Sequence, residues 1–263
     1  MKLLTFIFAN IEWFLIGWLA LTFIILAVKD IRKKKKPNDK QMAKMRAEYE
    51  NSIFYKQTNI PFENVMEEGT ASYAKYRVFK ELEKIKLKHK SYFFDIDIPS
   101  TNSVGVHLDM VMVSSAGIFV FYPMALNHVV TGSITDDRWM AVVYGNKKID
   151  EFEWIDNPLM HIKRSVDAIE HMNPMQLDCC SYVVHVGNAV FEVENPTKTH
   201  IVSVDDLRNA MKNDVEVEAI TDDAFRFMNK VLGEYVNTQT EAIDDVISSD
   251  DLSFDDADVG EDT

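Results

Sequence analysis

The stretch Gly117-Ile118-Phe119-Val120-Phe121-Tyr122-Pro123-Met124 decides the fold of this chain. Its segment 118–122 is almost entirely apolar and consists of β-branched and aromatic residues, which favour strands. A continuous apolar run of this length is typical of a central strand that is covered on both faces. The stretch therefore predicts a sheet flanked by helices.

The sequence around this strand predicts an α/β domain. Val78, Phe79, Leu82 and Ile85 recur at three- and four-residue spacing, which predicts a helix over 67–88. Pro158 directly after Asn157 is typical of a helix start, so we expect a helix over 158–172. Further helices are expected over 40–50, 205–211 and 222–235, with strands over 91–98, 106–114, 118–122, 128–134, 138–144 and 182–191 and a loop over 53–65.

Around the central strand the sequence resembles the NERD family, the nuclease-related domains of the restriction-endonuclease-like fold. In that family the central strand usually runs Gly-Ile-Phe-Val-Ile-Glu-Thr-Lys, and its Glu and Lys belong to the metal and catalytic site. Here these two positions are Tyr122 and Met124. The preceding strand of the family carries Ile-Asp-His-Ile or Ile-Asp-His-Val, and Leu108-Asp109-Met110-Val111 keeps the Asp.

The resemblance covers roughly residues 66–212. Gly69-Thr70-Ala71-Ser72-Tyr73 falls in the register of the family's Gly-x-x-Gly-Glu, so Tyr73 stands at the position of the Glu. Gly132, Trp139 and Asn157-Pro158-Leu159-Met160-His161 follow the family's Gly, Trp and Asn-Pro-x-x-Gln, with His161 in place of the Gln. The resemblance implies a restriction-endonuclease-like mixed sheet flanked by helices, with a degenerate catalytic site.

Of the four catalytic positions that the resemblance implies, this chain keeps Asp109, which is a remnant candidate. A phenol and a thioether do not replace a carboxylate and an ammonium, because Mg²⁺ prefers hard oxygen ligands. We therefore predict no catalytic set and no metal site. Other polar residues near the expected site are interpreted as solvated or packed side chains: Glu67, Glu68, Glu81, Asp95, Asp97, His107 and His161.

Two functional hypotheses follow. The first is a pseudo-enzyme, a binding or scaffold module that needs no cofactor and has an unknown protein partner. The alternative is a divergent metal-dependent nuclease that acts on DNA or RNA through a rearranged site around Asp109, and Mg²⁺ is expected only under this alternative. Two or more carboxylates and a Lys converging within about 5 Å of Asp109 would favour the alternative. A net charge of −14 argues against a broad nucleic-acid surface. The sequence does not decide whether nucleic acid is a partner of this protein.

The N-terminal segment Leu3–Val28 predicts one transmembrane helix before this domain. It contains no Lys or Arg, and Asn10 and Glu12 are its strongly polar interruptions. About 20 apolar residues cross a hydrocarbon core of about 30 Å. The cations Lys29, Arg32 and Lys33 to Lys36 follow at once, which places the C-terminal side in the cytoplasm. A cleaved signal peptide is the competing interpretation, but such a peptide carries its basic residues before the apolar run.

We therefore expect a single-pass protein of the cell inner (cytoplasmic) membrane with its domain in the cytoplasm. Its predicted parts are an anchor over 1–31 with basic residues to 36, a connector over 37–65, the NERD-like domain over 66–236 and an acidic, disordered tail over 237–263. From Glu234 onward there are eleven Asp and Glu residues and no Lys or Arg. The adjacent Cys179 and Cys180 provide neither a disulfide framework nor a four-ligand zinc site.

The predicted topology can be tested in cells. A reporter fused after Thr263 should behave as cytoplasmic, and the protein should stay with membranes after a carbonate wash, because the apolar span holds it in the bilayer. Recovery of a processed, soluble species that starts near residue 29 would contradict the anchor.

Overall fold

The computed structural model describes residues 18–19, 21–22, 38–99, 105–145, 148–175, 177–193, 199–216 and 220–249. The chain divides into two compact units, Met1–Glu48 and Tyr49–Thr263. Helix α3 (Asp39–Glu50), of which the last two residues belong to the second unit, begins within one residue of the predicted start. The predicted membrane span lies outside the described residues except for four helical residues at 18–19 and 21–22. Among the residues that are described, no helix is both long and apolar enough to cross a membrane.

The second unit is built on a mixed five-stranded sheet, which confirms the predicted α/β class. Its strand order is β1-β2-β3-β7-β9. Strands β1 (Lys90–Ile98), β2 (Val106–Ser114) and β3 (Gly117–Ala125) are antiparallel neighbours, whereas β3 pairs in parallel with β7 (Cys179–Val186) and β7 with β9 (His200–Ser203). Strand β3 therefore occupies the centre, as its apolar sequence predicts.

A second, four-stranded sheet follows β3 along the chain. Its order is β6-β5-β4-β8, formed by β4 (Val129–Gly132), β5 (Arg138–Gly145), β6 (Lys148–Asp156) and β8 (Val190–Val193). The β4–β5 pair is antiparallel. A Cβ added to Gly132 would lie 2.2 Å from the ring of the buried Trp139, so the close approach of this ring requires glycine.

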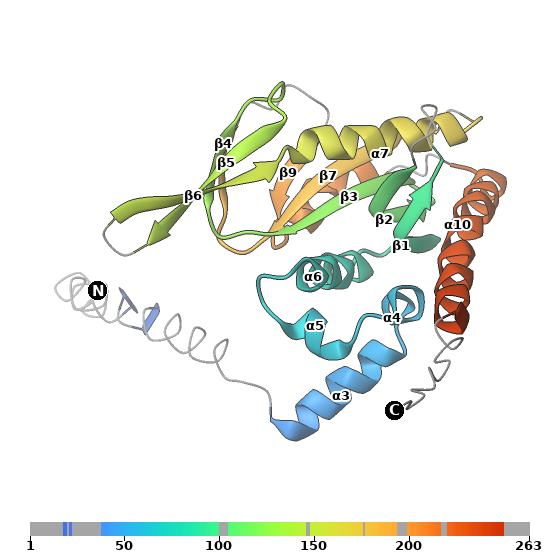
Figure 1. Ribbon diagram of the computed structural model, residues 1–263, viewed down its shortest axis with the longest axis horizontal. Helices are drawn as coiled ribbons and strands as arrows, with labels where there is room; N and C mark the ends of the chain where they lie inside the picture. The colour runs from blue at the N-terminus through green and yellow to red at the C-terminus, as the bar shows by residue number, and fades with distance from the viewer. Residues whose placement is uncertain are drawn as a thin grey trace, which may run out of the picture. The chain divides into compact units, whose positions relative to one another are not determined.

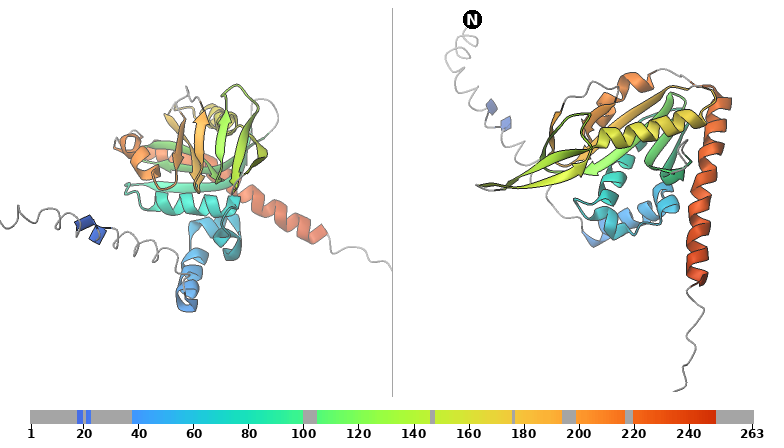
Figure 2. Two further views of the ribbon diagram at one scale, coloured as in Figure 1. Left: turned by 90° about the vertical axis from the view of Figure 1, so that its left-hand side faces the viewer. Right: turned by 45° about the horizontal axis from the view of Figure 1, so that its top comes forward.

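Helices cover both faces of the five-stranded sheet (Figure 1). Helix α6 (Ala71–Glu83) packs on β3 and β7 from one side, and α7 (Pro158–Met172) packs on β2, β3 and β7 from the other. The long helix α10 (Asp222–Ser249) runs beside β1 and β2 (Figure 2). Helix α7 has the predicted bounds because the side chain of Asn157 caps it, accepting a hydrogen bond from the N–H of Leu159 at 2.9 Å.

The predicted loop over 53–65 is wrong, because this segment forms the short helices α4 (Ile53–Thr58) and α5 (Phe62–Met66). Phe54 of α4 is fully buried, and its ring centroid lies 4.8 Å from that of Phe94 on β1. Gln57 of α4 also satisfies the backbone of the edge strand β1. Its amide donates to the carbonyl of Tyr92 at 2.9 Å and accepts from the N–H of Phe94 at 3.1 Å.

Two further expectations about elements need correction, and two strands were missed. The predicted strand over 182–191 splits into β7 and β8, because Gly187 adopts φ +118° and a Cβ added there would lie 2.4 Å from Oδ1 of Asn127. Strands β6 and β9 were not predicted. Helix α10 continues to Ser249, past the expected end at 235 and past the expected start of the tail at 237, and no Gly or Pro interrupts the segment 234–249. The short helices α8 (Leu207–Ala210) and α9 (Lys212–Val215) complete the unit.

Lys90 stabilises the turn between α6 and β1. Its ammonium donates to the carbonyls of Leu82 at 3.3 Å and Glu83 at 2.8 Å, the last two residues of α6. It also donates to the carbonyl of Ile85, just after the helix, at 3.1 Å. The carbonyl of Leu82 also accepts from the N–H of Ile85 at 3.1 Å, and the cation adds a charged donor at the helix end, where the macrodipole favours positive charge.

The substitution Lys90→Met should lower the free energy of unfolding by about 1–3 kcal/mol, because it removes a charged donor from three carbonyls. Denaturant unfolding monitored by circular dichroism measures the change. The matched control is Lys88→Met, whose ammonium lies 3.8 Å from the exposed Asp222 and which should cost about 0.5 kcal/mol or less. Equal effects of the two substitutions would contradict this role of Lys90.

Candidate functional site

Asp109 and Tyr122 lie at neighbouring positions of β2 and β3. Met110 pairs with Phe121, so Asp109 and Tyr122 take the next positions in this antiparallel register. Burial raises the pKa of Tyr122, and the nearby carboxylate of Asp109 raises it further. The strand register on which the resemblance depends is therefore correct. Met124, two residues further on β3, packs partly buried against the hydrophobic core.

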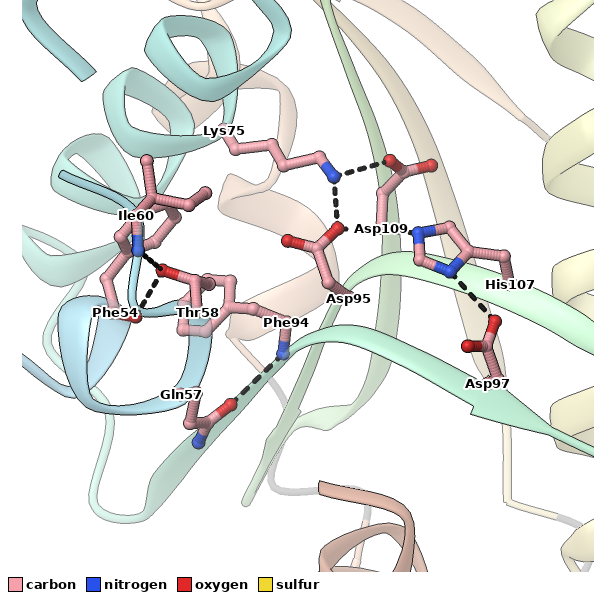
Figure 3. A network of polar contacts seen from close by, with 10 residues as sticks. All are labelled: Phe54, Gln57, Thr58, Ile60, Lys75, Phe94, Asp95, Asp97, His107 and Asp109. Carbon is pink, nitrogen blue, oxygen red and sulfur yellow. Dashed lines mark hydrogen bonds and ion pairs between the residues drawn. The ribbon is translucent and has the colours of Figure 1, made fainter. Parts of the chain in front are cut away.

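The ammonium of Lys75 contacts Asp109. The Nζ atom of Lys75, which α6 contributes, lies 2.9 Å from Oδ1 of Asp109 and also forms an ion pair with Asp95 (Figure 3). The Lys75 and Asp109 side chains are 12% and 15% exposed, so solvent screens this pair little. Sequence reasoning missed Lys75. Its signal was the helical spacing, because Lys75 precedes the buried Val78 and Phe79 by three and four residues and so lies on the buried side of α6.

Asp95 faces Asp109 from strand β1. Its neighbours Phe94 and Ile96 pair with Met110 and Leu108, and Asp95 itself has φ +50°, a left-handed conformation that is rare for residues other than glycine. The expectation that Asp95 belongs to a solvated face is wrong, because its carboxylate is partly buried and paired with Lys75. Backbone strain of this kind persists where the surrounding contacts require it.

His107 links Asp95 to Asp97. Its Nδ1 lies 2.9 Å from Oδ1 of Asp97 and its Nε2 lies 3.4 Å from Oδ1 of Asp95 (Figure 3). These contacts join β1 and β2 near the position of Asp109. We call the five residues Lys75, Asp95, Asp97, His107 and Asp109 the ion-pair cluster.

The comparisons with known proteins assign the domain that holds this cluster. Residues 70–186 match the family model NERD, described as Nuclease-related domain. The chain contains a nuclease-related domain. The match begins at Thr70, the N-cap of α6, and ends at Val186, the last residue of β7, so it includes the whole ion-pair cluster. No curated protein and no solved structure gives a significant match.

The charges of the ion-pair cluster nearly cancel within the nuclease-related domain. Burial alone would lower the pKa of Lys75, but Asp109 and Asp95 outweigh it and hold the pKa above its ordinary value. Burial alone would raise the pKa of Asp95, but His107 and Lys75 together keep it below its ordinary value. The hydrogen bond to Asp95 is the main reason that the pKa of His107 rises to about 9, so His107 is an imidazolium at neutral pH. Two cations thus face three carboxylates.

This arrangement does not fit the divalent metal that the family implies. Donor atoms of Asp95, His107 and Asp109 do lie within 4.8 Å of one another, which is close enough for three ligands of one ion. The ammonium of Lys75 contacts both carboxylates, however, and a protonated imidazole has no lone pair for a metal. Mg²⁺ also prefers oxygen ligands to imidazole.

The other expected positions lie around the cluster without joining it. Tyr73 is on α6, where its hydroxyl accepts a hydrogen bond from Arg77 at 3.1 Å. Glu81 forms ion pairs with Lys84 and with Arg208. His161 packs on Tyr122 with a ring distance of 4.6 Å, and burial lowers its pKa, as expected of a packed rather than a charged residue.

The substitution Lys75→Met should destabilise the domain by about 3–5 kcal/mol, because it removes the ammonium that pairs with both Asp95 and Asp109 and leaves these partly buried carboxylates facing each other. Denaturant unfolding of the single variants and of Lys75→Met/Asp109→Asn gives the coupling energy. We expect the double variant to recover at least about 1 kcal/mol relative to additivity.

Lys80→Met is the matched control on the same helix, because Lys80 pairs with Glu83 on an exposed surface. Its cost should be about 0.5 kcal/mol or less. Additive effects of Lys75→Met and Asp109→Asn would contradict the coupling.

Proposed function

We propose that the nuclease-related domain works as a non-catalytic binding or scaffold module, which the segment Leu3–Val28 tethers to the cytoplasmic face of a membrane. The contact of the Lys75 ammonium with both Asp95 and Asp109 carries this proposal. Metal-dependent hydrolysis needs carboxylates that bind the ion which polarises the phosphate and activates water. Here these oxygens are already paired with a cation that belongs to the protein.

The neighbouring positions support the same conclusion. Tyr122 and Met124 occupy the strand where the resemblance implies a carboxylate and an ammonium, and Tyr122 packs on His161 rather than on a charged group. A partly buried phenol with a raised pKa stays neutral and supplies no charge for metal binding. The scaffold of the domain is kept while its expected chemistry is replaced by packing and ion pairs.

Cleavage assays test the proposal. The full chain with Mg²⁺ or Mn²⁺ should leave single- and double-stranded DNA and RNA intact, and Asp109→Asn should not change any trace activity. Loss of a metal-bound carboxylate costs several kcal/mol of transition-state stabilisation, and each 1.36 kcal/mol is about tenfold in rate. A true site would therefore lose about 10³-fold or more in this variant.

Asp167→Asn is the matched control, since it removes an exposed carboxylate of α7 outside the cluster. Circular dichroism establishes that each variant is folded. Mn²⁺-dependent cleavage by the parent and by Asp167→Asn, but not by a folded Asp109→Asn, would overturn the proposal.

The second candidate function is cleavage by a rearranged metal site, and the convergence of Asp95, His107 and Lys75 on Asp109 favours it. The condition for this function is two or more carboxylates and a Lys close to Asp109. Asp95 and Lys75 supply one carboxylate and the Lys, so this condition is met in part. This function requires that Lys75 leave the carboxylates and that His107 lose its proton. Saturable Mn²⁺ binding that Asp95→Asn and Asp109→Asn both abolish would support it over the binding module.

A further inference from the structure

Strand β6 forms an open edge of the four-stranded sheet, whose order is β6-β5-β4-β8. It is nine residues long, whereas strands usually have about 5–6 residues. Among the residues that the structure describes, β5 is its one strand partner. The far end of the β5–β6 pair extends away from helices α6 and α7 (Figure 1). The free side of β6 therefore presents backbone N–H and C=O groups with which a further strand can pair.

One face of β6 carries exposed aromatic side chains. Side chains alternate between the two faces of a strand. Ile155 packs against the hydrophobic core and pairs with the buried Trp139, so Phe152 and Trp154 differ in their exposure according to the face that each strand position takes. They are 61% and 55% exposed, and their rings contact each other edge to face with centroids 6.0 Å apart. A long edge strand with exposed apolar side chains is a site at which another chain can add.

The charge of β6 selects the kind of chain that can add. Arg138 on β5 lies 3.5 Å from Asp156 and compensates its charge, whereas Glu153 is exposed between the two aromatic residues. Like charges opposite each other destabilise a strand pair, so a second copy of β6 is disfavoured, and an anionic lipid surface would be repelled as well. A strand with Lys or Arg residues would instead form pairs of opposite charge. The strand contains one ammonium and four carboxylates: Lys148, Asp150, Glu151, Glu153 and Asp156.

We propose that β6 binds an extended, basic segment of a partner protein, which adds to this sheet as a fifth strand. The backbone of the segment pairs with the free edge of β6, and its apolar side chains contact Phe152 and Trp154. Its Lys or Arg residues lie on the opposite face and approach Glu153. In this mode of recognition the backbone hydrogen bonds supply affinity and the alternating side chains supply specificity. The surface lies outside the ion-pair cluster, so the proposal does not depend on whether that cluster is catalytic.

Fluorescence anisotropy of a labelled heptapeptide with the full chain tests this edge. The probe is Lys-Val-Lys-Val-Lys-Val-Lys, in which cations and apolar side chains alternate as the added strand requires. One control peptide, Glu-Val-Glu-Val-Glu-Val-Glu, reverses the charge, and the other, Lys-Lys-Lys-Val-Val-Val-Lys, keeps the composition but not the alternation. We expect the probe to bind at least about tenfold more tightly than either control. Equal binding of the two Lys peptides would overturn the proposal, because attraction to any acidic segment would then explain both.

Exposed positions of β6 provide the variants. Phe152→Ser/Trp154→Ser removes the apolar contacts and Glu153→Lys reverses the charge, and each should weaken binding of the probe about tenfold. The matched controls are Val190→Ser, at an exposed position of the opposite edge strand β8, and Asp167→Lys, at an exposed position of α7. Both controls should change the affinity less than about twofold, because neither residue lies on the edge of β6.

Circular dichroism establishes that each variant is folded. Unchanged binding of the probe by a folded Phe152→Ser/Trp154→Ser variant would overturn the proposal, and so would the absence of binding by the parent. Sedimentation of the parent tests the competing occupant. Self-association that the same double variant abolishes would assign the edge of β6 to a second copy of this chain instead.

Discussion

Burial of strand β3 on both faces is the constraint on which the rest of the structure depends. Ile118, Phe119, Val120 and Phe121 are each no more than 2% exposed, and burying a side chain of this size stabilises a protein by about 1.5–3 kcal/mol. Both faces must therefore be covered, by α6 on one side and α7 on the other. The parallel pairing of β3 with β7 then requires a long connection, and β4, β5, β6 and α7 form it.

The same sheet brings the remaining carboxylates together at β1 and β2. Asp95 and Asp109 face each other across neighbouring strands, where two buried negative charges would repel each other strongly. Lys75 reaches them from α6 and His107 from β2, so the protein itself supplies the positive charge. The left-handed backbone at Asp95 costs of order 1–3 kcal/mol, and the ion pairs that it permits offset this cost. These carboxylates thus have cationic partners that belong to the protein itself.

The elements that sequence reasoning placed correctly have local signals. Strand β2 and helix α7 have the expected bounds. Polar and apolar residues alternate in the first part of β2 and apolar residues fill its second part, whereas α7 starts at the helix-start signal Asn157-Pro158. Helices α4 and α5 were missed because they are short and have little stability of their own. They form because Phe54 and Phe62 join an aromatic cluster with Tyr49 and because Gln57 pairs with the edge of β1. Such contacts cannot be seen in a local pattern.

The sequence by itself determined the α/β class, the relation to nuclease-related domains, and the neighbouring positions of Asp109 and Tyr122. These features follow from the periodic spacing of apolar residues and from the order of the family's motifs, and both can be seen in the sequence itself. Tertiary structure alone decided that Lys75 and Asp95 complete the environment of Asp109. The physical reason is range: an ion pair acts over about 3–4 Å, and residues 20 or more positions apart meet at that distance only after helix and sheet have packed.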